Sequence, residues 1–463
     1  MLDLIVIGAG PAGMGAATEA AAHGLDVLVL DEQGAPGGQI YRAIEAQERP
    51  RHGQPDVLGA DYWRGREAVD RFRASGSGYV PGATVWTVEP DPPTVGYVTE
   101  AGGAVVRQAR RIVVATGAYE RPVPIPGWTL PGVMTAGAAQ TLMKSSGAVF
   151  DDRVILAGSG PLLMLVGEQL LASGVEVGGF VETTAWDDYR SALRHLPSAL
   201  LAPRLLAKGL AMRRRIKASG VPMYSGARGL RAEGEGRFRR LCFETRGRPH
   251  RLDGDLLLLH EGVVPNVQIS RALRLEHTWH PAQRYWRPAC DTWGVTSAEA
   301  ILVAGDGGGI DGAQAAEVGG RLAGLRIAHD LDRLTVLERD RLAAPLFARR
   351  SSEMRIRPLL DHLYRPSQAV ICPADPETIV CRCEDVDVAS VLAATSAGAS
   401  GPNQLKAFTR CGMGPCQGRL CGLTVAELMA RQLGRPVEEI GSYRIRPPIK
   451  PVTIAMLASV GNG

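Results

Sequence analysis

Residues 2–31 of the chain, LDLIVIGAGPAGMGAATEAAAHGLDVLVLD, determine its fold class. Residues 3–7 are mostly apolar and predict a buried strand, and residues 26–30 predict a second one. Between them, residues 11–23 are rich in alanine and predict a helix that ends at Gly24. This strand–helix–strand order is typical of an α/β protein with a parallel sheet.

The turn between the first strand and the helix has the spacing of a nucleotide site. Its first glycine permits a tight turn, its second lets a pyrophosphate approach the backbone, and its third lets the helix pack on the strand. The helix N-terminus offers N–H groups and a positive dipole to phosphates. An acid at the end of the second strand would bind the ribose. The predicted site, preferred over an ordinary glycine-rich turn, comprises Gly8, Gly10, Pro11, Ala12, Gly13 and Asp31, with Glu32 as the local rival of Asp31.

The same plan recurs at residues 153–182, so the chain contains an internal repeat of the module. Gly158 and Gly160 match the first two glycines, but Leu163 replaces the third and predicts a displaced helix. Glu182 ends the next strand and favours a ribose with a free hydroxyl. Two interpretations stay open: a site for an adenine nucleotide (ATP or NAD), or a vestigial module.

Two later segments favour FAD over NAD in the first module. Val113–Gly117 and Ile301–Asp306 each lead from a predicted strand into a glycine turn. Together with the loop Pro36-Gly-Gly-Gln39 they resemble the two-dinucleotide-binding-domain flavoproteins. The resemblance implies an Ala-Thr-Gly segment near the adenosine, an aspartate on the ribityl chain, and a loop near the pyrophosphate and flavin. These implied FAD contacts are Gly38, Gln39, Ala115, Thr116, Gly117, Gly305 and Asp306.

Five of the eight cysteines lie between residues 381 and 421, and this density favours a metal site over disulfides. The pattern resembles the [2Fe–2S] domain of bacterioferritin-associated ferredoxin. In the most similar variant the second cysteine pair is Cys-x4-Cys, which implies the ligands Cys381, Cys383, Cys416 and Cys421. Cys411 stays an alternative ligand, because Cys411 and Cys416 have the same spacing. Zinc is the rival metal, since four cysteines suit it equally well.

The composition is that of a globular protein of several domains, with 463 residues, 45% hydrophobic residues and a net charge of +4. The small charge gives no argument for nucleic acid, and no segment is apolar enough to predict an integral membrane protein. We expect a cytoplasmic protein, with peripheral attachment to the inner membrane through its electron acceptor as an alternative.

The expected architecture is a two-module α/β flavoprotein with a small helical [2Fe–2S] domain. The FAD-binding domain is expected at residues 1–150 and 280–335, and the second Rossmann-like domain at 151–279. A linker is expected at 336–376, the [2Fe–2S] domain at 377–435, and an extended tail at 436–463.

The whole chain resembles the α (A) subunits of heteromeric, FAD-dependent amino-acid and opine dehydrogenases. The resemblance rests on residues 36–42 (PGGQIYR), 131–136 (PGVMTA), 157–163 (AGSGPLL), 410–419 (RCGMGPCQGR) and 446–451 (RPPIKP). It implies a partner β subunit that resembles D-amino-acid oxidases and oxidises the substrate. An FMN between α and β, a small third subunit, and a quinone or ferredoxin-like acceptor belong to the same expectation.

Two further functions remain as alternatives: an autonomous NADH-dependent reductase, and an assembly scaffold with structural cofactors. Leu163 argues against the reductase, and the set of cysteines argues against the scaffold. We find no candidate general base in the sequence, so the catalytic residues stay unassigned.

Overall fold

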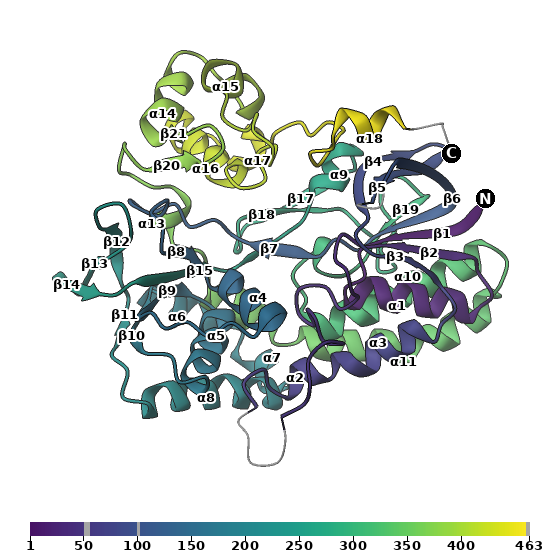
Figure 1. The fold of residues 1–463 in the computed structure, drawn as a ribbon, viewed down its shortest axis with the longest axis horizontal. Helices are drawn as coiled ribbons and strands as arrows, with labels where there is room; N and C mark the ends of the chain where they lie inside the picture. Colours follow the sequence, from purple (N-terminus) through teal and green to yellow (C-terminus); the bar gives the residue numbers. More distant parts are fainter. Residues whose placement is uncertain (51–55, 100–101, 460–463) are drawn as a thin grey trace.

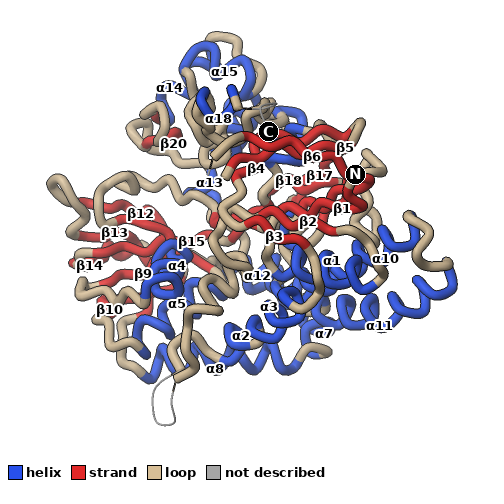
Figure 2. The backbone as a smooth tube through the Cα atoms, turned by 45° about the vertical axis from the view of Figure 1, so that its right-hand side comes forward, coloured by secondary structure: helices blue, strands red, loops and turns tan. Residues whose placement is uncertain are grey.

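The computed structural model describes residues 1–50, 56–99 and 102–459 (Figure 1). Two α/β modules lie side by side, and a smaller, mostly helical unit that carries the clustered cysteines lies against both. Figure 2 shows the strands of the two modules as separate sheets, each with helices beside it.

The first module contains a seven-stranded sheet. The apolar run of β1 is buried at Leu4, Ile5 and Val6, as is typical of a central parallel strand. In sheet order the strands are β3 (Gly78–Val80), β2 (Val27–Leu30), β1 (Leu2–Ile7), β6 (Ala104–Val114), β5 (Pro93–Val98) and β4 (Thr84–Pro90), with β19 (Ile301–Val303) also beside β6. β4, β5 and the start of β6 are antiparallel, and the remaining pairs are parallel.

Glycines allow two helices of this module to pack unusually closely. A Cβ atom on Gly320 would lie 1.9 Å from the carbonyl oxygen of Ala12, and one on Gly15 would lie 2.6 Å from that of Glu317. The close pair is α1 (Pro11–Ala22) and α10 (Ala313–Asp330). The other helices of the module are α2 (Ala60–Trp63), α3 (Gly65–Arg73) and α11 (Val336–Met354), with a 3-10 turn at Gly305–Gly307.

The second module contains a parallel five-stranded sheet and an antiparallel three-stranded one. The first has the order β11 (Met223–Ser225), β10 (Val177–Glu182), β9 (Val154–Ser159), β15 (Leu256–Glu261) and β8 (Val133–Thr135). The second comprises β12 (Arg228–Glu233), β13 (Arg240–Thr245) and β14 (Arg248–Asp253). The helices are α4 (Ala136–Ser146), α5 (Pro161–Ala172), α6 (Trp186–Leu193), α7 (Leu196–Leu200), α8 (Pro203–Ala218) and α12 (Arg357–Leu363).

The boundaries between the modules lie earlier in the chain than expected. β8 pairs with β15, so residues 133–146 belong to the second module and not to a first domain over 1–150. The chain crosses from the first module to the second through β7 (Ala118–Glu120) and returns through β16 (Val263–Pro265). These two crossing strands pair with each other in antiparallel fashion. After them α9 (Gln268–Ala272), β17 (His277–His280) and β18 (Tyr285–Pro288) follow, and α9 packs against β4 of the first module.

The segment expected to be a linker, 336–376, is mainly helical. The side chain of Thr335 accepts a hydrogen bond from the backbone N–H of Glu338, and the Glu338 carboxylate accepts one from the N–H of Thr335. This reciprocal capping starts α11 and explains why a basic, proline-containing stretch forms a helix. Residues 368–371 add the short helix α13 (Gln368–Ile371).

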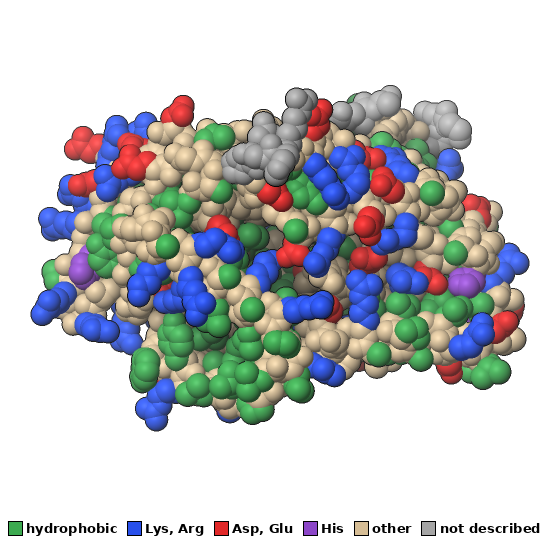
Figure 3. Space-filling view, turned by 90° about the horizontal axis from the view of Figure 1, so that it is seen from below, with side chains coloured by type: hydrophobic (Ala, Val, Ile, Leu, Met, Phe, Trp, Pro, Cys, Tyr) green, Lys and Arg blue, Asp and Glu red, His purple; other side chains and the backbone are tan. Residues whose placement is uncertain are grey.

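The cysteine unit contains β20 (Ile379–Cys381), β21 (Val386–Asp387), α14 (Val388–Ser396), α15 (Pro402–Thr409), α16 (Gly422–Leu433) and α17 (Val437–Ile440). The segment expected to be an extended tail, 436–463, begins with α17, has no helix or strand at 441–453, and then forms α18 (Ile454–Ala458). Helices α6 to α8 leave several leucines exposed, and Figure 3 shows hydrophobic side chains gathered on that face, beneath α7 and α8. Within the described ranges, no helix combines the length and hydropathy needed to cross a bilayer.

Candidate functional site

Four parallel strands of the first module end side by side, and the predicted nucleotide residues follow them. Strand β1 is in register with β2 and β6, and β6 is in register with β19. The residues directly after these strands are Gly8, Asp31, Ala115 and Ala304. The carboxyl edge of this sheet is where open α/β folds bind their ligands.

The first glycine turn has no room for side chains. A Cβ atom on Gly8 (φ +104°) would lie 2.5 Å from the carbonyl oxygen of Ala115, and one on Gly13 would lie 1.8 Å from that of Gly8. Gly10 caps α1, Pro11 takes the first helical position, and the first turn carries no acidic side chain. The positive end of α1 is therefore open to a phosphate.

The loop at residues 36–39 lies against this turn. A Cβ atom on Gly38 would lie 2.8 Å from the Cα atom of Gly10. The carbonyl oxygen of Gln39 accepts a hydrogen bond from the buried ammonium of Lys144 at 3.3 Å. Burial lowers the pKa of Lys144 to about 8. Lys144 was not predicted, because its only signal in the sequence is its i,i+4 spacing from Gln140, to which it also donates at 2.9 Å.

Asp31 and Glu32 occupy different environments. The buried carboxylate of Asp31 accepts hydrogen bonds from the N–H groups of Ala9 and Gln33, and desolvation raises its pKa. Glu32 is exposed and forms an ion pair with Lys450 of the C-terminal tail. Asp31 therefore stabilises the glycine turn through the N–H of Ala9, while Glu32 and Lys450 form an ion pair beside Asp31. Lys450 was not predicted, because the sequence gives no sign that the tail reaches this edge.

The remaining predicted FAD residues gather at the same edge. The Asp306 carboxylate accepts hydrogen bonds from the N–H groups of Asp311 and Gly312, at 3.0 and 3.1 Å, just before α10. Desolvation raises the pKa of Asp306. Gly117 accepts a hydrogen bond from the N–H of Asn266 at 2.9 Å, which ties the Ala-Thr-Gly segment to the second crossing. A glycine turn free of side chains, the open N-terminus of α1 and two buried carboxylates suit a dinucleotide.

The turn of the second module differs from the first. Leu163 is buried in the apolar core of the module, whereas the corresponding Gly13 has no space for a Cβ atom. The geometry of helix and turn therefore differs between the two modules. A Cβ atom on Gly158 would lie 1.8 Å from the carbonyl oxygen of His260, and one on Gly160 would lie 3.3 Å from its ring.

Glu182 and His260 lie on either side of this second turn, in register with Gly158. The Glu182 carboxylate is paired with the Arg213 guanidinium at 2.9 and 3.0 Å, and it also accepts from Ser225. His260 is buried and its Nδ1 lies 2.6 Å from Glu120 Oε1. These side chains already have partners, so a ribose would have to share Glu182 with Arg213.

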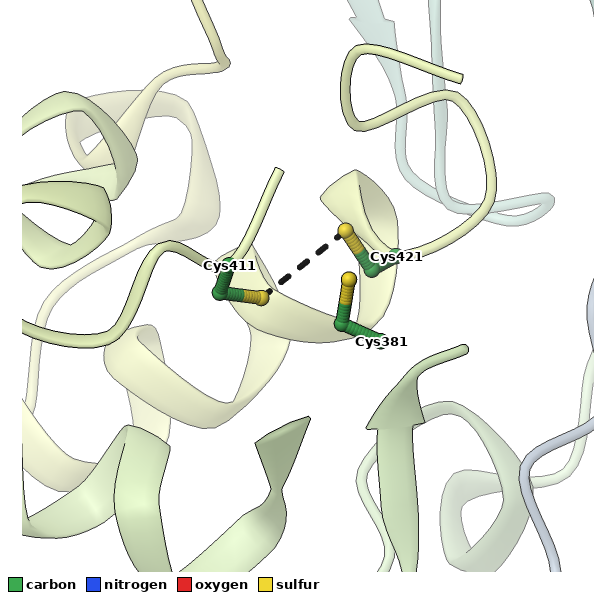
Figure 4. Close-up of side chains that lie close together, drawn as sticks. All are labelled: Cys381, Cys411 and Cys421. Atoms are coloured by element: carbon green, nitrogen blue, oxygen red, sulfur yellow. Dashed lines mark hydrogen bonds between the residues drawn. The ribbon is translucent and has the colours of Figure 1, made fainter. Parts of the chain in front are cut away.

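Three of the clustered thiols lie together in the interior of the cysteine unit (Figure 4). The sulfur atoms of Cys381, Cys411 and Cys421 are within 4.8 Å of one another, and all three residues are buried. The thiol of Cys411 donates to that of Cys421 at 3.9 Å, and hydrogen bonding by both holds the pKa of Cys381 far below its usual range. Cys383 and Cys416 form a second pair, with sulfur atoms 3.6 Å apart.

Each predicted ligand therefore lies next to another clustered cysteine. Burial raises the pKa of Cys383, and the side chain of Cys416 raises it further. The fifth thiol, Cys411, lies as close to Cys381 and Cys421 as a ligand would. Tyr443 of the tail packs over the loop between the cysteines: a Cβ atom on Gly412 would lie 2.5 Å from its ring, and one on Gly418 2.3 Å. The sequence gives no sign of this contact.

Hydrogen bonds attach the cysteine unit to the first crossing strand and to the second module. Tyr119 Oη donates to the carbonyl oxygen of Arg419 at 2.9 Å, next to the first crossing. Trp128 Nε1 donates to the carbonyl oxygen of Ile379 at 2.7 Å, and its ring lies 5.1 Å from the guanidinium of Arg382. The thiols thus lie between two anchored stretches of chain.

Two family models match the chain. One, described as "Pyridine nucleotide-disulphide oxidoreductase", matches residues 2–320, and the other, described as "Sarcosine oxidase A3 domain", matches residues 375–460. The second match covers the cysteine unit and the tail together.

Curated relatives are similar over nearly the full length. The A subunit of opine oxidase from Rhizobium meliloti is 43% identical, covering 99% of this chain and 87% of the relative. The HcnB subunit of hydrogen cyanide synthase from Pseudomonas aeruginosa is 32% identical, covering 99% of this chain and 98% of the relative.

The fold also matches a solved structure of L-proline dehydrogenase from P. horikoshii. The TM-score is 0.69 over 98% of this chain and 79% of that chain, at 20% identity, which supports a shared fold alone. On the full-length identity and the two family models, the chain belongs to the pyridine nucleotide-disulphide oxidoreductase family, as an α (A) subunit of the heteromeric FAD-dependent amino-acid and opine dehydrogenases.

Proposed function

We propose that the chain is the electron-transfer subunit of a dehydrogenase that oxidises an amino acid, imino acid or opine at a partner β subunit. D-hydroxyproline, octopine and nopaline are candidate substrates. The observation that carries the proposal is the joint presence of a dinucleotide cradle and a group of five cysteines in one chain, in which we find no candidate general base.

The first module would hold FAD, with the N–H groups at Gly10 to Gly13 on the pyrophosphate and Asp306 on the ribityl chain. FAD would supply reversible two-electron chemistry. Four cysteines of the unit would hold a [2Fe–2S] cluster, with Cys381, Cys383, Cys416 and Cys421 as the proposed ligands and Cys411 as the alternative. Such a cluster would pass electrons singly.

The remaining parts of the proposal concern partners. A D-amino-acid-oxidase-like β subunit would oxidise the C–N bond, and an FMN would lie between α and β; a small third subunit is an option. A quinone or a ferredoxin-like protein would take the electrons, in the cytoplasm or at the inner membrane. The second module would hold an adenine nucleotide, ATP or NAD.

Purification with and without the β subunit tests this division of labour. The isolated chain should contain flavin and iron but show no dehydrogenase activity on opines or D-hydroxyproline with an artificial electron acceptor. Co-expression with the β subunit should produce that activity. Full turnover by the isolated chain, or a purified chain that contains neither flavin nor iron, would contradict the proposal.

An NADH-dependent reductase is the second candidate, and the glycine turn at Gly158 and Gly160 is the observation in its favour. The pairing of Glu182 with Arg213 counts against it, because the ribose-binding carboxylate is engaged. Mixing the FAD-loaded chain with NADH in a stopped-flow instrument distinguishes the two. We expect slow flavin reduction, whereas reduction at the rate of turnover would favour the reductase.

A further inference from the structure

A cavity of about 60 Å³, partly open to solvent, lies between the cysteine unit and the segment that returns to the first module. One wall is apolar, with Val264 and Val267 on the returning segment and Leu423 and Ala426 on α16. Side chains of α9, β18 and the tail complete it. None of the residues proposed to bind FAD lines this cavity, so it is separate from the nucleotide cradle.

Residues that line this cavity carry buried polar atoms without hydrogen-bond partners. Within the part of the chain that the structure describes, five such atoms belong to its lining residues: Gln268 Oε1, Arg271 Nε and Nη2, Trp286 Nε1 and Arg419 Nε. Gln268 is only 6% exposed. Each unpartnered buried group costs roughly 1–3 kcal/mol. Four of the five atoms are N–H donors, so the cavity suits a ligand rich in acceptors.

The cavity also contains a cation without a counter-charge. The Arg271 guanidinium lies 4.8 Å from the centre of the Trp286 ring, and no acidic residue is found among the described side chains that line the cavity. Burial alone lowers the pKa of Arg271 to about 10, so the group stays protonated at neutral pH. A buried charge is costly unless an opposite charge pairs with it.

None of the clustered cysteines lines the cavity, and none of their thiols is a hydrogen-bond partner of Arg271 Nε or Nη2. Gln268 connects the cavity to the cysteine loop, since its Nε2 donates to the carbonyl oxygen of Cys416 at 3.3 Å while its Oε1 has no hydrogen-bond partner.

We propose that this cavity binds a small organic anion, with a carboxylate or phosphate paired to Arg271 and an apolar or aromatic body between Trp286 and the wall of α16. The N–H donors of Arg419 and Trp286 would complete the contacts to the anion or its polar substituents. The ligand would contact Gln268, whose Nε2 is bonded to the carbonyl oxygen of Cys416, so its binding would affect the cysteine loop. The inference goes beyond the proposed function and does not depend on it.

Isothermal titration calorimetry on the full chain with its cofactors, alone and with the β subunit, tests the proposal. The probes are benzoate, phenyl phosphate and inorganic phosphate. We expect saturable binding of benzoate or phenyl phosphate; the preferred one identifies the anionic group. Inorganic phosphate alone should bind more weakly, since it lacks the body. Arg271→Gln should weaken binding about tenfold or more, while the control Arg274→Gln, which removes an exposed charge one turn away, should not.

A second measurement separates a ligand-binding arginine from a structural one. Because Arg271 has no acidic partner, Arg271→Gln should leave the unfolding temperature of the probe-free chain unchanged or raise it. No saturable binding, or equal binding by both arginine variants, would overturn the proposal. Two results together would also overturn it: Arg271→Gln binds the β subunit more weakly, and the complex binds no probe. The anion paired with Arg271 would then be a carboxylate of the partner subunit. Flavin and iron contents, which test the proposed function, are measured separately.

Discussion

The third glycine of the first turn offers the sharpest test of the nucleotide cradle. In Gly13→Ala the new Cβ atom would lie 1.8 Å from the carbonyl oxygen of Gly8, whereas real Cβ contacts stay above 3.0 Å. The backbone would have to move by at least about 1.2 Å, the difference between these distances. Helix α1 has little freedom to do so, because Gly15 and Gly320 hold it against α10.

Overpacking of this kind costs about 1–3 kcal/mol, and the better helix propensity of alanine returns only about 1 kcal/mol. The displaced amides should also weaken FAD binding at least about tenfold, equivalent to about 1.4 kcal/mol. The flavin-to-protein ratio after gel filtration and the unfolding temperature measure both effects. Gly34→Ala is the matched control, since nothing lies within 4 Å of its Cβ position. If Gly13→Ala retained FAD and stability like this control, the turn would not be the phosphate cradle.

Four further predictions concern the second module, the cysteine unit and pH. Leu163→Ala, at the position that corresponds to Gly13, should lower the free energy of unfolding by about 2–5 kcal/mol through a cavity without changing the flavin content; loss of FAD would contradict the separate roles of the modules. Cys421→Ser should abolish the iron content while Cys411→Ser retains most of it, and the reverse result would make Cys411 the ligand. Trp128→Phe removes a hydrogen bond worth about 0.5–1.5 kcal/mol and should speed proteolysis between the second module and the cysteine unit; unchanged cleavage would refute that anchoring role. Burial lowers the pKa of His277 to about 4, so between about pH 6.5 and pH 4 the unfolded chain binds a proton that the folded chain does not. The free energy of unfolding, measured in urea, should therefore fall as the pH drops through this window, and it should fall less for His277→Gln.

Local patterns in the sequence predicted both modules, because a turn and its flanking strand and helix are encoded within about 30 residues. They did not predict the module boundaries. β8 and α4 follow the first module in sequence, but β8 completes the second sheet by pairing with Leu257–Leu259 more than a hundred residues later. Which strand a short apolar segment joins depends on long-range packing that its own residues do not reveal.

For the cysteine unit too, the sequence alone does not determine which residues lie together in the fold. Spacing identified a group of five thiols but left the choice of four open, and in the fold Cys411 lies beside Cys381 and Cys421. Lys144, next to Gln39, was missed because a lysine in a helix is ordinarily a solvent-exposed residue; only the fold shows that it is buried.

The C-terminal tail has a consequence for how the protein is made. After leaving the cysteine unit, it adds Lys450 beside Glu32, and Ser459 Oγ then accepts a hydrogen bond from the N–H of Ala104. Residues from distant parts of the chain thus meet: Glu32 with Lys450, and Ala104 with Ser459. A ribosome that has released only the first module has not yet delivered the lysine, so the Glu32–Lys450 pair forms only after the cysteine unit has also left the ribosome.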